Sequence, residues 1–402
     1  MERYDLPERW EWKKIGEIAK VVSGSTPKTN VAEYWNGNIL WATPKDLGKL
    51  NSITIDNTER TITELGLNSC SAQILPPGSV LLTSRAPIGH LAINTKPMCT
   101  NQGFKNLIPG PEIYNRYLYW VLKFSVRDLQ HIGRGGTFEE ISKSMVESFE
   151  IPLPPLAEQK RIVARIEELT RRVEEMRRLR RETIENITYF LDSSISRIFR
   201  ANGGWQETTL GKVLTLVQYG LSSKLTTEPH GYPVIRMGNI KDGRVVTDDL
   251  KYLDIPTSEA SKYILKKGDI LINRTNSAEL VGKAGLFQED GKYLFASYLI
   301  RLRVNPEAVA PAFINYYINS PDGQAFLKTQ GKDAIGQTNI NAKQIRQMPV
   351  SLPPLDEQRR LVQYLDYLQQ KANGLKQLQA ETEAELAAFT PALLAKAFRG
   401  EL

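Results

Sequence analysis

The feature that most constrains this 402-residue chain is an eleven-residue segment that occurs twice. The first copy is LPPLAEQKRIV, residues 153–163, and the second is LPPLDEQRRLV, residues 352–362. Eight of the eleven positions are identical, and the two copies are 199 residues apart. A match of this length, separated by about half the chain, indicates that one unit has been duplicated.

Each copy opens a segment with the spacing of a long helix. Its two prolines suit the first turn of a helix, and apolar residues then recur in steps of four and three. In the first segment the predicted seam is Ile162, Ile166, Leu169, Val173 and Met176; Arg180 and Thr183 interrupt it, and it resumes at Ile187 and Phe190. Adding 199 gives Leu361, Leu365, Leu368, Ala372, Leu375, Gln379, Thr382, Leu386 and Phe389. These steps predict the narrow heptad seam of a coiled coil.

Both segments also contain residues that predict a cap or a kink near their ends. In the first they are Asp192, Ser193 and Ser194, and in the second Thr390 and Pro391. Ser, Thr and Asp are preferred at helix N-caps, and proline suits the position that follows. We therefore expect a short separate helical piece after each break.

The segments before the two helices predict mixed α/β domains. Short apolar runs, such as 38–42 and 78–83, alternate with clusters of Gly, Pro, Ser and Asn. The aromatic stripe at 114–129 has helical spacing and predicts core packing. The segment Leu75-Pro-Pro-Gly78 is echoed by Leu265-Lys-Lys-Gly268, which predicts one fold with divergent surfaces.

The predicted fold class is α+β, with two similar α/β domains that are each followed by a long helix. The expected boundaries are 1–152 for domain 1, 153–200 for the first helix, 201–350 for domain 2 and 351–402 for the second helix.

Charge favours pairing of the two helices with each other. Residues 158–181 carry nine Lys/Arg against five Glu, whereas residues 356–385 carry four Lys/Arg against six Asp/Glu. A basic and an acidic heptad helix prefer each other to self-pairing. The domain between them can return the chain, so we expect an antiparallel coiled coil. The alternative, in which each helix packs separately on its own domain, remains open.

Bulk composition excludes some classes. The net charge of +7 and pI near 9.1 favour a polyanionic partner. No run is long and apolar enough for a membrane helix, and the charged N-terminus does not resemble a signal peptide. Cys70 and Cys99 could pair, but two thiols in so large a chain predict reduced residues of a cytoplasmic protein. With three scattered histidines they form no metal-ligand cluster, so no metal site is expected.

Motifs for catalysis are missing from the sequence. Gly282-Lys283 lacks the leading glycine and the hydroxyl residue of a phosphate-binding loop. His90, His131 and His230 have no nucleophile at a diagnostic spacing. Scattered carboxylates leave a hydrolytic pair open. We therefore predict a chain without a catalytic site, and keep a stand-alone DNA methyltransferase or nuclease as an alternative.

Two variable α/β domains, each followed by a near-identical helix that starts at LPPL-x-EQ-[KR]-R, resemble the specificity subunits of type I restriction-modification systems. The resemblance covers essentially the whole chain. It implies two target-recognition domains that read the halves of an asymmetric, split target on double-stranded DNA, held apart by an antiparallel coiled coil. It also implies docking of methyltransferase subunits, in two copies, and of restriction subunits. The expected cofactors, S-adenosylmethionine, ATP and Mg²⁺, would then bind those partners. A coiled-coil scaffold that binds proteins is the other alternative.

Residues that read DNA are expected on polar, Gly-rich loops, because Arg, Lys, Asn and Gln contact base edges while Ser and Thr hold phosphates. In domain 1 the candidates are Ser23, Ser25, Thr26, Lys28, Thr83, Ser84, Arg85, Asn101, Gln102, Lys105, Arg134 and Thr137. In domain 2 they are Gln218, Tyr219, Ser222, Lys224, Arg236, Asn239, Asn273, Arg274, Thr275, Asn276, Lys332, Gln337, Thr338 and Asn339. For each position, an ordinary solvated loop is the competing interpretation.

Partner docking is expected on exposed faces at the two helix starts, where the copies match. The candidates are Glu158, Gln159, Arg161, Glu357, Gln358 and Arg360. The same identities would also be explained by glutamates that interact with free amides of the first helical turn.

Overall fold

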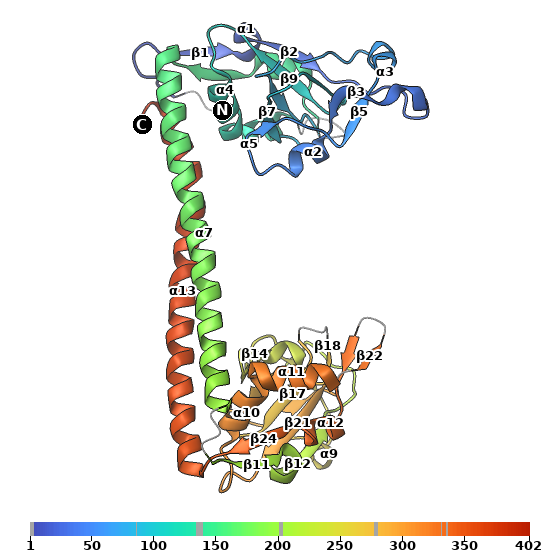
Figure 1. The fold of residues 1–402 in the computed structure, drawn as a ribbon, viewed down its shortest axis with the longest axis vertical. Helices are drawn as coiled ribbons and strands as arrows, with labels where there is room; N and C mark the ends of the chain where they lie inside the picture. The colour runs from blue at the N-terminus through green and yellow to red at the C-terminus, as the bar shows by residue number, and fades with distance from the viewer. Residues whose placement is uncertain are drawn as a thin grey trace. The chain divides into compact units, whose positions relative to one another are not determined.

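The computed structural model describes residues 4–85, 87–133, 140–200, 204–276, 280–330, 332–334 and 337–402. The chain divides into two compact units, the first formed by residues 1–179 and 380–402 and the second by residues 180–379. Each unit contains one globular domain together with parts of two long helices (Figure 1).

Domain 1, in the first unit, is built on two sheets. The larger has the order β2-β9-β6-β7-β4, with β2 (Ala19–Ser23), β9 (Lys105–Pro109), β6 (Val80–Leu82), β7 (Leu91–Asn94) and β4 (Thr54–Ile55). The smaller has the order β5-β3-β8, with β5 (Arg60–Ile62), β3 (Trp35–Ala42) and β8 (Met98–Thr100).

Domain 2, in the second unit, repeats this plan. Its larger sheet has the order β12-β21-β17-β19-β15-β14, with β12 (Leu214–Tyr219), β21 (Leu299–Val304), β17 (Ile270–Asn273), β19 (Ala284–Leu286), β15 (Arg244–Val245) and β14 (Ile240–Lys241). The smaller is β16 (Lys251–Leu253), β13 (Tyr232–Ile235) and β20 (Leu294–Phe295). Except for the added edge strand β14, the strand orders of these sheets match those of domain 1. The prediction of one fold with divergent surfaces is confirmed.

Shorter elements complete the two domains. In each domain, one antiparallel strand pair leads into the start of the long helix. The pair is β1 (Glu11–Lys14) with β10 (Glu150–Leu153) in domain 1, and β11 (Gln206–Thr209) with β24 (Pro349–Leu352) in domain 2. A further sheet contains β18 (Thr275–Asn276), β23 (Gln337–Asn339) and β22 (Lys332–Ala334). The short helices are α1 (Ile15–Ile18), η1 (Ala32–Tyr34), α2 (Pro44–Gly48), α3 (Glu64–Asn68), α4 (Asn115–Phe124), α5 (Val126–Ile132), α6 (Lys143–Ser148), α8 (Leu210–Val213), η3 (Met237–Asn239), α9 (Thr257–Ala260), α10 (Pro311–Asn319), α11 (Pro321–Gln330) and α12 (Ala342–Arg346).

The local sequence explains the central strands and the aromatic helix. Every residue of β6 and of β17 is buried, and all of them except Asn273 are apolar, as expected for short apolar runs that form core strands. Gly78 and Gly268, at φ +90° and +89°, turn the chain just before these strands, in a conformation that side chains with a Cβ rarely adopt. Most of the aromatic stripe forms α4, whose Tyr117 and Trp120 are buried in the core, so the prediction of core packing is confirmed.

The two repeated segments form the long helices α7 (Leu156–Arg200) and α13 (Leu355–Arg399), each of 45 residues. The expected breaks are wrong, because both helices continue through 192–194 and through Pro391. Proline removes one helical hydrogen bond. Leu393, Leu394 and Ala397 are buried beyond it, and their packing accounts for a helix that does not end there.

In each unit the two helices pair antiparallel. In the first unit, Arg161 donates to the Leu402 carbonyl, just beyond the end of α13, and Arg177, further along α7, donates to Glu383 of α13. In the second unit, Arg180 donates to both the side chain and the carbonyl oxygen of Gln379 at 2.8 and 2.5 Å. Residues later in α7 therefore contact residues earlier in α13, which is the pattern of an antiparallel pair. The antiparallel pair is confirmed, and separate packing of the helices is excluded.

The predicted seam is correct only in part. Ile162, Ile166 and Val173 are buried, as are Leu365 and Ala372. Four apolar residues of the predicted seam are instead exposed: Met176 (43%), Phe190 (60%), Leu375 (48%) and Phe389 (40%). Just after Val173, Arg177 bonds to Glu383 across the pair, one residue later than the predicted Met176. Arg180 bonds to Gln379 at the position where the sequence predicted a polar interruption.

The far end of each helix packs on the domain of the other repeat. In the second unit, Phe199 at the end of α7 lies against Phe313 and Tyr317, at ring-centroid distances of 5.1 and 5.2 Å. In the first unit, Phe398 at the end of α13 lies against Tyr117 and Phe124, at 5.5 and 5.4 Å. Each domain core is therefore completed by both long helices.

Cys70 and Cys99 are both free thiols. Burial raises the pKa of the Cys99 thiol to about 12. Among the described residues, no helix combines the length and hydropathy needed to cross a membrane, and no group of His, Cys, Asp or Glu is arranged to hold a metal ion.

Candidate nucleic-acid interface

In domain 1, two predicted DNA-reading loops come together. The loop after β2 contains Ser25 and Thr26, and it contacts the loop between β8 and β9. Thr26 donates to the Gln102 side chain, and the Ser25 amide donates to the Thr100 carbonyl at 3.0 Å. Lys28 is exposed on the same loop, and Ser23 is exposed at the end of β2. The structure thus gathers residues from both predicted loops into one surface.

A charged cluster lies beside these loops. Arg85 Nη1 is 3.8 Å from Glu140 Oε2, and Lys105 Nζ is 3.6 Å from Glu140 Oε1. A Cβ added to Gly103 would lie 3.6 Å from Arg85 Nε and 3.1 Å from Asn101 Oδ1, so Arg85 and Asn101 both border that glycine. Arg134 and Thr137, two further candidates, lie outside the described residues.

Several candidates are not exposed as the sequence predicted. Thr83, Ser84, Lys105, Asn239 and Asn273 are all buried. Thr83 donates to the Pro87 carbonyl and accepts from the His90 amide, so its hydroxyl holds the loop rather than facing solvent. Asn239 likewise accepts from the Arg236 amide and donates to the Asp248 carbonyl. The same polar residue types occur where a side chain bonds to the loop backbone and where it faces solvent, so one sequence alone does not distinguish the two cases.

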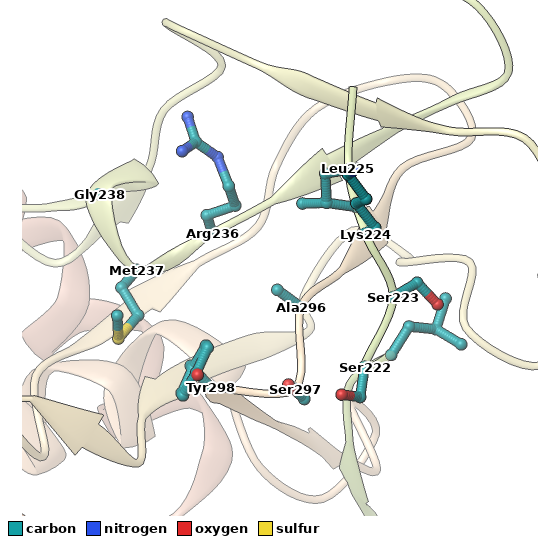
Figure 2. A pocket seen from close by; sticks show the side chains of 11 residues that line it. Ser222, Ser223, Lys224, Leu225, Arg236, Met237, Gly238, Ala296, Ser297 and Tyr298 are labelled. Atoms are coloured by element: carbon teal, nitrogen blue, oxygen red, sulfur yellow. The ribbon is translucent and has the colours of Figure 1, made fainter. Parts of the chain in front are cut away.

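In domain 2, the predicted loop residues Ser222, Lys224 and Arg236 border a pocket of ≈ 550 Å³ (Figure 2). Three loops supply its walls, Leu221–Leu225, Arg236–Gly238 and Ala296–Tyr298. Arg236 Nη2 donates to Asp249 Oδ2 at 2.9 Å, and the side chain is 28% exposed. Tyr298, which the sequence analysis missed, is 54% exposed at the rim. The pocket offers cations, hydroxyl groups and an aromatic face together.

The other candidates of domain 2 form contacts within the domain. Gln218 accepts from Arg301, a buried residue, and donates to the Lys262 carbonyl at 3.3 Å. Arg274 stacks over the Tyr219 ring, with its Cζ 4.8 Å from the ring centroid.

Strands carry the remaining candidates. Thr275 donates to Asn339 Oδ1 at 2.5 Å, and Asn276 pairs with Thr338 between β18 and β23. Lys332 lies in β22, and Gln337 lies in β23.

At the helix starts, the expectation that the two glutamines are exposed is wrong. Gln159 is 0% exposed and Gln358 is 1% exposed. Gln159 accepts from the Tyr114 amide and donates to the Glu112 and Pro154 carbonyls, at 2.8, 2.9 and 2.8 Å. Gln358 accepts from the Ala310 amide and donates to the Pro353 carbonyl, at 2.9 and 2.8 Å. These glutamines join each helix start to α4 or α10 of its own domain.

The charged residues of the helix starts are more exposed. Arg161 donates two hydrogen bonds of 2.8 Å to Glu158, and these bonds are the main cause of the lowered pKa of the Glu158 carboxyl. Glu357 accepts from the Trp205 indole at 3.3 Å, and Arg360 is exposed. The glutamates are thus bonded to side chains, and Arg161 and Arg360 remain accessible to a partner.

Sequence reasoning also missed Glu140. A signal for it existed, because Glu140 and Asn339 are separated by the same 199 residues as the two helices, and each precedes an isoleucine, Ile141 or Ile340. The constant 199-residue separation between equivalent positions therefore begins before the repeated segment. It already holds at Glu140 and Asn339, which pair with the residues that follow β6 and β17.

Comparison with known proteins gives consistent matches over this chain. Residues 7–186 and 202–386 each match the family model of the type I restriction modification DNA specificity domain. The EcoKI specificity subunit of Escherichia coli K12 is 26% identical over 423 aligned residues, which cover 99% of this chain and 90% of that protein. The MjaIX specificity subunit of Methanocaldococcus jannaschii is 46% identical over 159 residues, which cover 39% of this chain and only 37% of that protein.

Two solved structures are similar over the full length. One, described as the structural basis of complex assembly and conformational transition of the type I R-M system, has a TM-score of 0.78 at 26% identity and covers 100% of both chains. The other, the HsdS subunit from Thermoanaerobacter tengcongensis, has a TM-score of 0.65 at 26% identity and covers 99% of both.

Proposed function

Because this chain belongs to the type I restriction modification DNA specificity family, with two recognition domains, we propose that each domain reads one half of an asymmetric, bipartite target on double-stranded DNA. The observation that carries this proposal is that the two domains share their strand order but differ in polar side chains at equivalent positions. Domain 1 has the ion pair Arg85–Glu140 where domain 2 has the neutral pair Thr275–Asn339. Two domains with the same backbone arrangement but different polar side chains are suited to reading two half-sites of different sequence.

The paired helices are proposed to set the spacing between the half-sites. Their equal length of 45 residues and the constant 199-residue step support this role, because an insertion in one helix alone would break the pairing register. Arg180 and Gln379 are themselves separated by 199 residues, so the contact joins equivalent positions of the two repeats.

Methyltransferase subunits, in two copies, and restriction subunits are the proposed partners. Matched exposed apolar residues support two equivalent docking surfaces. The first unit carries Met176, Leu179 and Phe389, and the second carries their equivalents Leu375, Leu378 and Phe190, all between 40% and 60% exposed. Exposed apolar residues clustered on a helix favour protein contacts. Arg161 and Arg360 are proposed to extend these contacts toward the helix starts.

The chain is proposed to catalyse no reaction itself. In this proposal, S-adenosylmethionine, ATP and Mg²⁺ bind the partner subunits, and the whole complex works in the cytoplasm. The purified chain incubated with DNA, Mg²⁺ and S-adenosylmethionine should neither methylate nor cleave it. Activity without a partner subunit would contradict this part of the proposal.

The test of DNA reading is genetic and direct. Methylated adenines are mapped across the genome of the source organism with and without this gene, and one asymmetric bipartite motif should lose its methylation on deletion. Purified chain with its methyltransferase subunits should bind DNA with a log–log salt slope of several units. If no motif disappears and binding ignores salt, the proposed function is wrong.

A further inference from the structure

Glu140 is placed in domain 1 by its backbone as well as by its ion pairs. Arg85 and Glu140 form an isolated antiparallel β-bridge, and the Ile141 amide donates to the Ser84 carbonyl at 3.0 Å. The main chain therefore holds the carboxylate opposite Arg85. Lys105 approaches from β9 and also donates to the Ser84 hydroxyl at 3.3 Å. Two cations, Lys105 from β9 and Arg85 from the segment after β6, converge on one carboxylate.

The three charges differ in their access to solvent. The side chains of Arg85 and Glu140 are each 39% exposed, whereas that of Lys105 is 9% exposed. Burial lowers the pKa of Lys105, and the nearby Glu140 opposes that effect. A ligand can thus reach the guanidinium and the carboxylate, while the lysine stays beneath them. The accessible part of the cluster is one donor group next to one acceptor group.

The equivalent place in domain 2 has the same backbone and a different chemistry. Thr275 pairs with Asn339 between β18 and β23, and the Ile340 amide donates to the Arg274 carbonyl at 2.8 Å, as Ile141 does to Ser84. The side chains there form a neutral hydrogen bond instead of an ion pair. Because the backbone contact persists without the charge, the charge of Glu140 is not required by the fold.

We propose that Glu140 is a specificity-determining residue of domain 1, which orients Arg85 toward a guanine and itself accepts from the amino group of a cytosine. Arginine donating to guanine O6 and N7, and a carboxylate accepting from cytosine N4, are standard base contacts in the major groove. The negative charge also disfavours phosphate at this point, so Arg85 is kept for base edges. The proposal deepens the proposed function and rests on it.

The main experiment replaces Glu140 in the full chain, assembled with its methyltransferase subunits. E140Q keeps the shape and removes the charge. Preference at one G·C pair of the domain 1 half-site should fall about ten- to a hundredfold, and R85K should relax that same pair. Binding to unrelated DNA should tighten with E140Q, with a salt slope steeper by about one, because Arg85 becomes available to a phosphate.

Glu59 provides a matched control. It lies in the same domain and also joins two cations, Lys45 at 3.1 Å and Lys49 at 3.0 Å, neither of which belongs to the Arg85 cluster. E59Q makes the same change in net charge and should leave the recognised motif unchanged. If E59Q relaxes the motif as E140Q does, the loss of any negative charge from domain 1 is enough to relax specificity, and the proposal is wrong.

A second variant covers the case in which E140Q does not fold. E140D keeps the charge and shortens the side chain, so it should keep weak binding to unrelated DNA yet lose preference at the same G·C pair. An unchanged motif with a folded E140Q or E140D overturns the proposal. Failure of the proposed function would look different, because the wild-type complex itself would then methylate no specific motif.

Discussion

Single residues decide how the repeated segment works, and Gln358 is the clearest case. Its side chain is 1% exposed and bridges the Ala310 amide and the Pro353 carbonyl, so it joins the start of α13 to the start of α10. Gln159 has the same role in the other repeat. Identity between the two copies of the segment thus reflects a structural joint in both.

The first prediction follows from the burial of this joint. Gln358→Ala leaves the buried Pro353 carbonyl and the part-buried Ala310 amide without this partner, which should lower the free energy of unfolding by about 2 kcal/mol or more. Urea denaturation followed by circular dichroism measures the loss. Gln363→Ala, at an exposed position on the same helix, is the control and should have little effect. Equal midpoints for the two variants would contradict the assigned role of Gln358.

At this scale the sequence located residues better than it oriented them. The repeat singled out Gln159 and Gln358, but an identical pair is expected both for a buried joint and for an exposed docking site. The loop candidates had the same ambiguity: Lys105 and Asn273 have polar side chains typical of DNA contacts, and both are buried. Orientation depends on strand pairing, which a single sequence does not specify for short loops.

At the scale of elements, spacing predicted the helices and their partnership well. The helix starts followed from the prolines of the repeat, the pairing from the heptad steps and the opposite charges, and the antiparallel direction from the domain that lies between the helices. The part of the seam just beyond Val173 could not be predicted, because arginines occupy it while apolar residues are exposed beside it. Arg177 bridges to Glu383 across the pair, and Met176 is left 43% exposed. Hydrophobicity alone predicts Met176 in the contact between the helices and Arg177 in solvent, which is the reverse of what the structure shows.

The second prediction concerns the polar contact between Arg180 and Gln379. A half-buried polar pair in a coiled-coil seam fixes register at some cost in stability. The double variant Arg180→Leu with Gln379→Leu should therefore raise the thermal midpoint by a few degrees, for about 1–2 kcal/mol. Light scattering after size exclusion should also reveal additional association states.

Arg181→Leu controls for added apolar surface, because Arg181 is exposed and adjacent in sequence. It should leave the thermal midpoint unchanged. A double variant at Arg180 and Gln379 that unfolds at a lower temperature would show that the pair is a net source of stability.

At the scale of the molecule, duplication explains the architecture. The two domains share the strand order of their main sheets, although their sequences resemble each other only faintly outside the helices. Composition and periodicity predicted two α/β domains, but not the order of the strands, because that order is set by contacts distant in sequence. The constant 199-residue step was the sequence signal that related the two halves of the chain to each other.

The third prediction tests the spacing role. A second copy of residues 177–183 is inserted after 183, and a second copy of 376–382 after 382, so that both helices gain a heptad. Seven residues add about 10 Å to a helix, or about three base pairs of DNA. Methylation mapping should show the same half-sites with a spacer longer by about that amount. The insertion in one helix only should abolish recognition, and an unchanged spacer would refute the role.

The packing of Phe398 against Tyr117 has a consequence for biosynthesis. Domain 1 is synthesised first, yet its core includes Leu394, Ala397 and Phe398, which follow α4 by about 270 residues. At roughly 5–20 residues per second, a ribosome needs tens of seconds to supply them. During that interval the nascent first domain exposes the apolar surface that α13 later covers. Chaperone demand should therefore peak before translation ends, while domain 2 is still being made.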